Sequence, residues 1–387
     1  MSKCFVIVCS YAPSLVNFRG ELLKQIKQNG HRIVAVAPDF DSKIRLWCRS
    51  NDIETEDFQL NNQGMNPFRD LVSIYQLYQI IRKYNADVVL GYTHKPALYT
   101  AFAGFLARVP HVTMMVTGLG FGFETDSLKK KIVNSIVKMM FYVTCLQCDR
   151  IIFHNKDNLQ FFIQSKIVKD ETKCTVVAGS GIDLSQFSRL EFSETKNSNL
   201  VFLLIARIVR YKGIIEYATA AQSLKKKYPD SQFLLVGYRD NNPASYDDEE
   251  WKFITQNVTY MGKSDKIAEM IRLAHVYVLP SYGEGLPRTV LEAMASGRAI
   301  ITADSPGCRD TVIENRNGHL VQVKDSKSLA NAMERFLSGN SDWRRMGDES
   351  YKMALQLFDV KQVNRQMIDA LKLGQTGNVI GGPNQGQ

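Results

Sequence analysis

The sequence predicts an α/β protein with two doubly wound domains that face each other across a central cleft. Short runs of β-branched residues alternate with segments of helical periodicity along almost the whole chain. The strand candidates are nearly continuous apolar runs, which is typical of parallel sheets covered by helices on both faces. One polar stretch, Ser185–Asn199, interrupts this alternation, which then starts again. The 387 residues also suffice for two or three domains with a core each.

The first half contains six short apolar runs that predict strands. We expect these strands at Cys4–Cys9, Arg32–Ala37, Asp87–Gly91, His111–Val116, Arg150–Phe153 and Cys174–Val177. Between them, apolar residues recur at helical spacing. The corresponding helices are expected at Val16–Asn29, Phe68–Tyr84, Pro96–Ala107, Leu128–Leu146 and Asp157–Lys166. We therefore predict a first domain over residues 1–184.

The second half repeats this pattern after the polar stretch. The expected strands are Asn199–Ile205, Gln232–Val236, Val258–Tyr260, Val276–Leu279 and Ala299–Thr302. The expected helices are Ile214–Lys227, Lys266–Leu273, Arg288–Ser296, Ser326–Leu337 and a stretch near Asp342–Gln356. These elements predict a second domain over residues 185–358.

The C-terminal segment follows the second domain. A helix candidate at 359–373 comes after that domain is complete, so we expect it to pack back on the first domain. Residues 374–387 are rich in Gly, Asn and Gln with almost no apolar content, which predicts a disordered tail.

Charge and cysteine content narrow the classes of function. The net charge of +9 is spread over both halves and favours anionic partners. A nucleic-acid-binding module is the weaker interpretation, because the basic residues are dispersed and no nucleic-acid-reading motif occurs. The seven cysteines are an odd number and most lie in apolar runs, which fits reduced thiols in a cytoplasmic enzyme. No run approaches the ~18 apolar residues of a membrane-spanning helix.

The stretch Leu279–Thr302 carries the strongest functional signal. A strand leads through a Gly-rich turn into a helix, with Glu284 in the turn and Glu292 inside the helix. The free N–H groups of Arg288 and Thr289, together with the helix dipole, favour a phosphate there. Two carboxylates around a phosphate suit the recognition of sugar hydroxyls. On spacing alone, a stable helix start with surface acids is about equally compatible.

A second basic segment, Ala206–Gly213, follows the first strand of the second domain. Arg207 closes that strand and Lys212 comes just before a helix, so both are expected at the same sheet edge as Glu284. Two cations there could neutralise a diphosphate. A solvated basic loop is the alternative, and the convergence of the two segments argues against it.

The Glu284-x7-Glu292 pattern, with Arg207 and Lys212 upstream, resembles the retaining glycosyltransferases of family 4. These enzymes have the GT-B fold, in which two Rossmann-like domains face a central cleft, and the likeness extends over nearly the whole chain. Shorter segments are similar to a subgroup that contains N-acetylgalactosaminyltransferases acting on undecaprenyl-diphosphate-linked sugars. These segments are Ser180–Phe187, Val236–Ser245, Thr93–Tyr99 and Val116–Glu124.

The resemblance implies a role for each matching residue of the donor site. Glu284 would hold the donor-sugar hydroxyls near the reacting carbon, and Glu292 would bind the ribose. Arg207 and Lys212 would meet the donor diphosphate. His94 would face the donor sugar from the first domain. The same helix start would add further donor contacts from Gly285, Leu286, Arg288 and Thr289.

The acceptor side is less specific. Lys95 is expected to meet the acceptor diphosphate. Many family members carry a Gly-Gly turn after the first strand, whose backbone contacts the donor diphosphate; here Ser10–Ser14 replaces that turn. Arg19, just downstream, is a further candidate for the acceptor phosphates.

The resemblance implies no cofactor and no essential metal, the UDP-sugar being a substrate. The Asp39-Phe40-Asp41 motif is therefore interpreted as a polar loop rather than a metal site. The departing phosphate would take the acceptor proton, so that no side chain acts as a strong base. Glu284, His94, Lys212 and Arg207 would carry the chemistry by positioning and electrostatics.

The segment Ser127–Leu146 combines a cluster of lysines at 129–131 with a long apolar face. This pattern suits a helix that lies on an anionic membrane, where a lipid-linked acceptor would be found. An ordinary buried helix with a solvated lysine end is the alternative. The subgroup likeness favours a cytoplasmic protein bound peripherally to the cytoplasmic face of the inner membrane.

We therefore hypothesise the transfer of an N-acetylhexosamine, N-acetylgalactosamine first, from its UDP donor. The acceptor would be an undecaprenyl-diphosphate-linked saccharide in the assembly of a bacterial surface glycan or glycoprotein glycan. The alternatives are a family member that uses UDP-glucose, UDP-galactose or another acceptor, and a UDP-sugar epimerase of similar fold.

Overall fold

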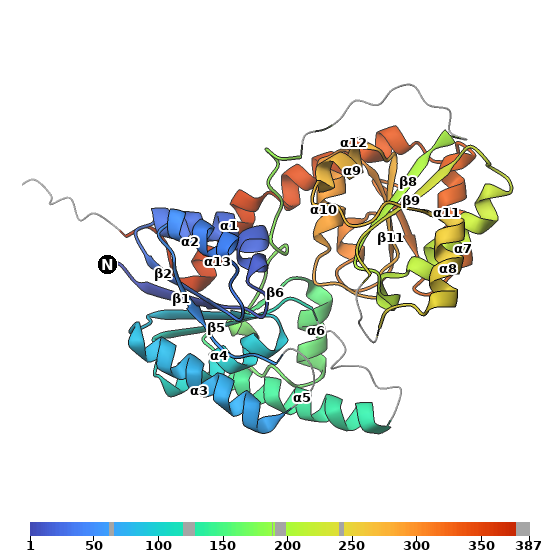
Figure 1. The fold of residues 1–387 in the computed structure, drawn as a ribbon. Helices are drawn as coiled ribbons and strands as arrows, with labels where there is room; N and C mark the ends of the chain where they lie inside the picture. The colour runs from blue at the N-terminus through green and yellow to red at the C-terminus, as the bar shows by residue number, and fades with distance from the viewer. Residues whose placement is uncertain (62–65, 119–127, 188, 190–198, 240–243, 377–387) are drawn as a thin grey trace, which may run out of the picture.

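The protein consists of two lobes, each built on one parallel sheet (Figure 1). The α/β class with two doubly wound units, predicted from the alternation of the sequence, is confirmed. The computed structural model describes residues 1–61, 66–118, 128–187, 189, 199–239 and 244–376, without the side chains of residues 128–130.

The first lobe contains a seven-stranded sheet. Its strands are β1 (Cys4–Val8), β2 (Arg32–Ala37), β3 (Glu54–Asp57), β4 (Val88–Tyr92), β5 (His111–Val116), β6 (Arg150–Phe153) and β7 (Cys174–Val176). They lie side by side in the order β3-β2-β1-β4-β5-β6-β7. The helices of this lobe are α1 (Pro13–Gln28), α2 (Ser42–Ser50), α3 (Pro67–Lys83), α4 (His94–Leu106), α5 (Leu128–Gln147) and α6 (Lys156–Gln164).

The second lobe contains a six-stranded sheet in the order β10-β9-β8-β11-β12-β13. Its strands are β8 (Val201–Ile205), β9 (Gln232–Val236), β10 (Thr259–Tyr260), β11 (Val276–Leu279), β12 (Ala299–Ala303) and β13 (Gly318–Val321). Its helices are α7 (Ile214–Lys225), α8 (Asp248–Asn257), α9 (Ile267–Arg272), α10 (Arg288–Ala295), α11 (Ser326–Leu337) and α12 (Trp343–Leu357).

Both faces of each sheet are buried, as the continuous apolar strands require. In β1, Val6 and Val8 pack with α3, α4, α5 and α6, whereas Phe5 and Ile7 point to the opposite face, toward α1. All four side chains are fully buried. The period of two along each strand thus supplies both layers of the core.

The order of each sheet places a crevice at one defined edge. Successive connections run in opposite directions on either side of the β1–β4 pair and of the β8–β11 pair. In doubly wound sheets, ligands bind beyond the carboxyl ends of strands at such a switch point. The loops that follow β8 and β11 carry the predicted donor residues Lys212 and Glu284.

The C-terminal helix α13 (Val360–Leu371) belongs to the core of the first lobe (Figure 1). Its residues Met367, Ile368 and Leu371 are buried beside β1 and α1. Beyond the helix, the Thr376 hydroxyl donates to the Asn29 carbonyl at 3.1 Å, so the chain stays attached to the first lobe at least that far. Residues 377–387, most of the predicted tail, lie outside the described part of the chain.

Two connections cross side by side between the lobes. The Ile182 amide donates to the Phe358 carbonyl at 2.8 Å, and the Val360 amide donates to the Ile182 carbonyl at 3.0 Å. Gly181 has φ of +66°, and a Cβ there would lie 2.7 Å from the Cα of Val360. Glycine is thus required at this crossing both by the backbone conformation and by the space.

Four elements were absent from the prediction: β3, α2, α8 and β13. The strand β3 reads Glu-Thr-Glu-Asp and contains no apolar residue, and β13 begins with glycine and histidine. In α8 Ile254 is the buried residue, and the helix begins with a capping box between Asp247 and Glu250. Hydrophobic periodicity gave little signal for these elements, because β3 and β13 are edge strands and because α2 and α8 each bury only one residue fully, Cys48 and Ile254.

A half-buried histidine in the second lobe, His275, makes stability depend on pH. The Val201 amide donates to Nδ1 of His275 at 3.0 Å, and burial, with the charges of Arg298 and Arg344, lowers the pKa of His275 to about 4. An unfolded histidine has a pKa of about 6.5, so the unfolded chain binds more protons between these values. We expect stability to fall from pH 6.5 to pH 4, about 1–2 kcal/mol of it through this partly exposed ring.

The variant His275→Gln keeps an acceptor for the Val201 amide but removes the titrating group. Urea unfolding at several pH values should give a flatter profile for the variant than for the wild type between pH 6.5 and pH 4. An unchanged slope would assign the acid sensitivity to other groups.

Candidate active site

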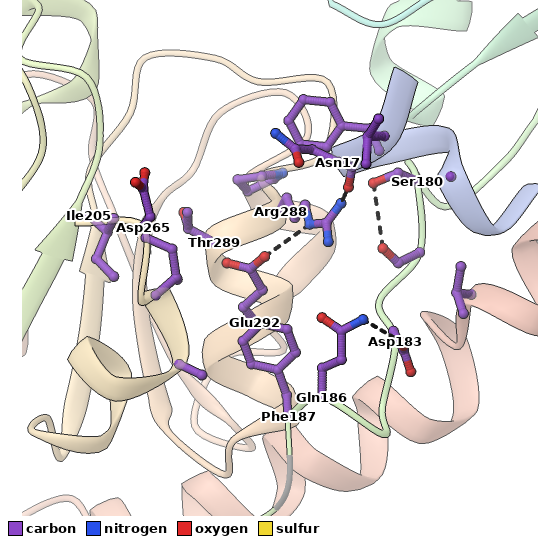
Figure 2. Close-up of a pocket in the computed structure, with 18 of the residues that line it drawn as sticks. Asn17, Ser180, Asp183, Gln186, Phe187, Ile205, Asp265, Arg288, Thr289 and Glu292 are labelled. Carbon is purple, nitrogen blue, oxygen red and sulfur yellow. Dashed lines mark hydrogen bonds and ion pairs between the residues drawn. The ribbon is translucent and has the colours of Figure 1, made fainter. Parts of the chain in front are cut away.

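A cavity of about 1310 Å³ lies between the two lobes. Figure 2 shows part of its wall: Asn17 comes from the first lobe, Ser180 and Asp183 from the crossover, and Arg288 and Glu292 from the second lobe. The predicted residues in its lining are Arg207, Lys212, Glu284, Arg288, Thr289 and Glu292. The structure thus brings together most of the predicted donor site.

The loops after β8 and β11 are locked to each other. The Tyr282 amide donates to the Tyr211 carbonyl at 2.9 Å, and the Ser281 hydroxyl donates to the same oxygen at 3.1 Å. Gly213, at φ +70°, begins α7 where a Cβ would collide with the Pro280 carbonyl. These contacts place Lys212, the last residue of a short 3₁₀ turn, directly beside Glu284.

Lys212 and Glu284 form an ion pair in the cavity wall. Each side chain is only 16% exposed, so the pair is partly shielded from water. Attraction between such charges is stronger than at an open surface. The cation predicted to meet a diphosphate is therefore held in place by the acid predicted to meet a sugar.

A second ion pair lies at the start of α10. Nε of Arg288 is 2.9 Å from Oε1 of Glu292, whose side chain is 8% exposed (Figure 2). Burial raises the pKa of the Glu292 carboxyl, and Arg288 opposes that rise. Arg288 also donates to the Asn17 carbonyl of the first lobe, so it bridges the cleft.

The N-terminus of α10 faces the same cavity. Pro287 is the N-cap and provides no side-chain hydrogen bond to the first turn. The N–H groups of Arg288 and Thr289 precede the first intrahelical donors, so they and the helix dipole favour an anion here. Arg207 is exposed at the edge of the cavity, where it donates to the Tyr211 hydroxyl.

The first-lobe candidates lie apart from this cluster. His94 begins α4, and its side chain is exposed. Nζ of Lys95 pairs with Asp70 at 2.9 Å, and both side chains are less than one-fifth exposed. Neither His94 nor Lys95 is among the residues that line the cavity.

Arg19 is buried rather than presented to the cleft. It is 3% exposed, and its Nη2 lies 3.0 Å from Nε2 of His154 and 2.9 Å from the sulfur of Met115. Burial lowers the pKa of Arg19 to about 10, which leaves it charged at pH 7. The predicted contact with acceptor phosphates would require this side chain to leave its pocket.

Asn155 is a residue of the site that sequence reasoning missed. It is 2% exposed, and its amide donates to the Glu284 carbonyl at 3.2 Å and the Gly285 carbonyl at 2.5 Å. Gly285 in turn lies so close to the first lobe that a Cβ would overlap the carbonyl oxygen of Thr117. An asparagine ahead of a helix signals an N-cap, but nothing in the sequence links it to a loop 129 positions away.

Within the described ranges, no cluster of three or more His, Cys, Asp or Glu side chains could hold a metal ion. Asp41 of the Asp39-Phe40-Asp41 motif instead caps α2, where its side chain accepts from the Ile44 amide at 2.8 Å. Of the predicted subgroup segments, 119–124 and 240–243 lie outside the described residues.

Two protein-family models match the chain. The model "Glycosyl transferases group 1" matches residues 186–353, and the model "Glycosyl transferase 4-like" matches residues 12–155. The two matches correspond to the second and the first lobe.

Curated relatives match over most of their length. An N,N'-diacetylbacillosaminyl-diphospho-undecaprenol alpha-1,3-N-acetylgalactosaminyltransferase of Campylobacter jejuni is 27% identical, covering 89% of this chain and 92% of the relative. A UDP-Gal:alpha-D-GlcNAc-diphosphoundecaprenol alpha-1,3-galactosyltransferase of Escherichia coli is 27% identical over 70% of this chain and 72% of the relative.

Solved structures share the architecture. HepE of Anabaena, crystallised with UDP, superposes with a TM-score of 0.74 at 18% identity, covering 96% of this chain and all of HepE. Sucrose-phosphate synthase of Thermosynechococcus elongatus gives the same TM-score and identity, covering 96% of this chain and 98% of that enzyme. At this identity the likeness concerns the fold.

Proposed function

Since the chain belongs to the glycosyltransferases and has the GT-B fold, we propose that it moves a sugar from a UDP donor to an undecaprenyl-diphosphate-linked saccharide. One observation carries the proposal: Lys212, Glu284, Arg288 and Glu292 meet at the N-terminus of α10 in the cleft between the lobes. The relatives of C. jejuni and E. coli, both named for undecaprenyl-linked acceptors, support the acceptor class.

The charges of the cleft suit a departing nucleoside diphosphate. Lys212, with Arg207 at the edge and the dipole of α10, would stabilise the negative charge that grows on UDP as the bond to the anomeric carbon breaks. Glu284 would hold hydroxyls of the donor sugar, and Glu292, the less exposed of the two acids, would hold the ribose. No metal or cofactor is assigned a step in this proposal.

We propose a retaining transfer. The bond between the anomeric carbon and the diphosphate breaks while the acceptor hydroxyl oxygen bonds the same face of that carbon. The acceptor proton passes to the departing phosphate oxygen, so no side chain needs to act as a base. A glycosidase-like pair of opposed carboxyls about 5 Å apart is not needed. Glu284 is instead paired with Lys212, which suits a binding role better than nucleophilic attack.

The donor sugar is proposed to be N-acetylgalactosamine. The C. jejuni relative, named for this sugar, matches 89% of the chain, whereas the galactosyltransferase of E. coli matches 70%. The test is a donor panel of UDP-GalNAc, UDP-GlcNAc, UDP-galactose and UDP-glucose with a short-chain polyprenyl-diphosphate saccharide. We expect a product heavier by one N-acetylhexosamine with the anomeric configuration of the donor. A product with the inverted anomeric configuration would overturn the retaining route. A product heavier by one hexose would show that the donor is UDP-galactose or UDP-glucose instead.

The same assay distinguishes the proposed transferase from a UDP-sugar epimerase. An epimerase converts the UDP-sugar without an acceptor, whereas the proposed transferase releases UDP when the lipid-linked saccharide is present. Conversion of the donor to its epimer in the absence of acceptor would favour the alternative.

We also propose that the first lobe binds the membrane surface that holds the acceptor. On α3, Phe68 is 83% and Leu71 61% exposed, one turn apart on one stripe. On α5, a second exposed stripe contains Ile132, Ile136, Met139, Met140 and Val143. Both helices flank α4 on the same face of the sheet (Figure 1). No described helix is both long enough and apolar enough to cross a membrane.

The apolar stripes and the lysines of α5 give a direct test. The variant Leu71→Asp is expected to weaken binding to anionic phosphatidylglycerol vesicles by about tenfold, because it removes apolar burial and adds like charge. The triple variant Lys129→Glu, Lys130→Glu and Lys131→Glu should weaken it as strongly and also abolish the preference for anionic lipid. Leu46 on α2, 64% exposed on the opposite face, provides the control Leu46→Asp. Equal binding of Leu71→Asp and the control in vesicle sedimentation would contradict this surface.

A further inference from the structure

The turn that carries Glu284 is held by both lobes. On the second-lobe side, the Glu284 amide donates to the Pro306 carbonyl at 2.9 Å, and Gly307 packs against the same turn. On the first-lobe side, the two carbonyls of the turn face Asn155. The Glu284 carboxylate itself points to Lys212. The backbone beneath this carboxylate is therefore fixed in part by a residue of the opposite lobe.

Asn155 uses the two ends of its side chain for two separate purposes. Its Oδ1 accepts from the Asn158 amide at 2.7 Å and so caps α6. Its Nδ2 donates to the carbonyls of Glu284 and Gly285 at 3.2 and 2.5 Å. Because the cap fixes the side chain on a helix end, the amide group is presented to the turn in one orientation. Few side chains other than asparagine can do both.

His154, the residue before Asn155, also lies against the Glu284 turn. The Nδ1 atom of His154 would lie 3.1 Å from a Cβ at Gly285, and its Nε2 lies 3.0 Å from Nη2 of Arg19. An arginine can only donate, so Nε2 is the acceptor and the neutral ring carries its proton on Nδ1, toward the turn. Burial and the charge of Arg19 lower the pKa of His154 well below its usual value, which keeps the ring neutral.

We propose that Asn155 is a positioning residue for the Glu284 turn, through which contact between the lobes sets the place of the Glu284 carboxylate. The inference rests on the proposed function, in which Glu284 holds the donor sugar. The second lobe binds the donor, and the Asn155 amide of the first lobe then holds the Glu284 carboxylate in the position that the reaction needs. An error of about 1 Å at such a group can lower a rate by about 10²-fold.

The variant Asn155→Asp separates the two purposes. A carboxylate oxygen still accepts from the Asn158 amide, so the cap of α6 remains, but the group that donated to the turn becomes an acceptor facing two carbonyls. We expect kcat to fall by about 10- to 100-fold, with the KM for the UDP-sugar changed by less than about threefold and a circular dichroism spectrum that shows a folded protein. The matched control is Asn66→Asp. Asn66 caps α3 of the first lobe through the Arg69 amide, and among the described residues its side chain has no hydrogen bond to the second lobe.

Hydrogen exchange gives a second readout that needs no activity. In Asn155→Asp the amides of the turn, that of Glu284 among them, should exchange at least about tenfold faster than in the wild type or in Asn66→Asp. Faster exchange with reduced kcat supports the proposal. Wild-type kcat and exchange in Asn155→Asp, or an equal loss in Asn66→Asp, would overturn it. A wild-type enzyme without transferase activity would refute the proposed function alone, since the exchange comparison still decides how the turn is held.

Discussion

Replacing Lys212 with alanine is expected to lower kcat by about 10²- to 10³-fold while the enzyme stays folded. The reason is electrostatic: negative charge grows on the departing diphosphate in the transition state, and a fixed cation in a shielded cleft stabilises that charge more than it stabilises the bound donor. Lys212 is fixed in this way by the locked loops after β8 and β11 and by Glu284. Steady-state kinetics measures the loss of kcat, and circular dichroism spectra check that the variant is folded.

The same 3₁₀ turn supplies the control. Arg210 begins the turn that Lys212 ends, but its guanidinium pairs with Glu250 on the exposed side of the lobe. The variant Arg210→Ala should keep kcat within about threefold, because exposed pairs contribute little. Similar losses in both variants would mean that the turn, and not the Lys212 charge, matters. Normal turnover in Lys212→Ala would remove Lys212 from the site.

Replacing Glu284 with glutamine is the second change with a large expected effect. Glutamine keeps the size of the side chain but removes the negative charge that orients Lys212 and would accept from the sugar hydroxyls. We expect kcat/KM to fall by about 10²-fold or more. UDP affinity, measured by calorimetry, should stay within about threefold, because the assigned contact is to the sugar.

Two further glutamates provide a comparison and a control for this variant. Glu292→Gln should weaken UDP itself, since this buried acid is assigned to the ribose, whereas Glu334→Gln changes an exposed pair with Lys227 and should alter neither quantity. A loss of UDP affinity in Glu284→Gln that equals the loss in Glu292→Gln would contradict the division of roles. Full activity in Glu284→Gln would exclude the proposed role of the Glu284 carboxylate in holding the donor sugar.

Acidic and basic side chains of the cleft pair with each other. Lys212 pairs with Glu284, and Arg288 pairs with Glu292 and bridges to Asn17 of the first lobe. A bound diphosphate would replace these acids as partner of the cations and release the acids for the hydroxyls of sugar and ribose. The pairs thus keep the donor side chains oriented before the donor binds, at a lower desolvation cost than isolated charges would have.

The course of the strands through the core could be predicted from the sequence because burial on both faces leaves a simple mark. The expected run His111–Val116 is the observed β5, and the expected helix Ser326–Leu337 is the observed α11. The strand β3 left no such mark. It lies at the sheet edge, where its parallel pairing with β2 forms it, and its side chains Glu54 and Asp57 only make exposed ion pairs with Arg32 and Arg45.

The sequence predicted those parts of the site that follow from the order of the strands. Lys212 and Glu284 meet because β8 and β11 are neighbours, which the motif and the alternation indicate. The burial of Arg19 depends on how α1 packs against His154 and Met115, which the sequence does not encode locally. The contact of Asn155 with the Glu284 turn depends on how the two lobes meet, which no single segment reports.

A crystal structure of the enzyme with UDP tests most directly where the departing group is received. We predict the diphosphate within hydrogen-bonding distance of Nζ of Lys212 and of the first N–H groups of α10, with the ribose on Glu292. A nucleotide bound elsewhere, or one bound with Lys212 and Glu292 turned away from it, would contradict the proposed site.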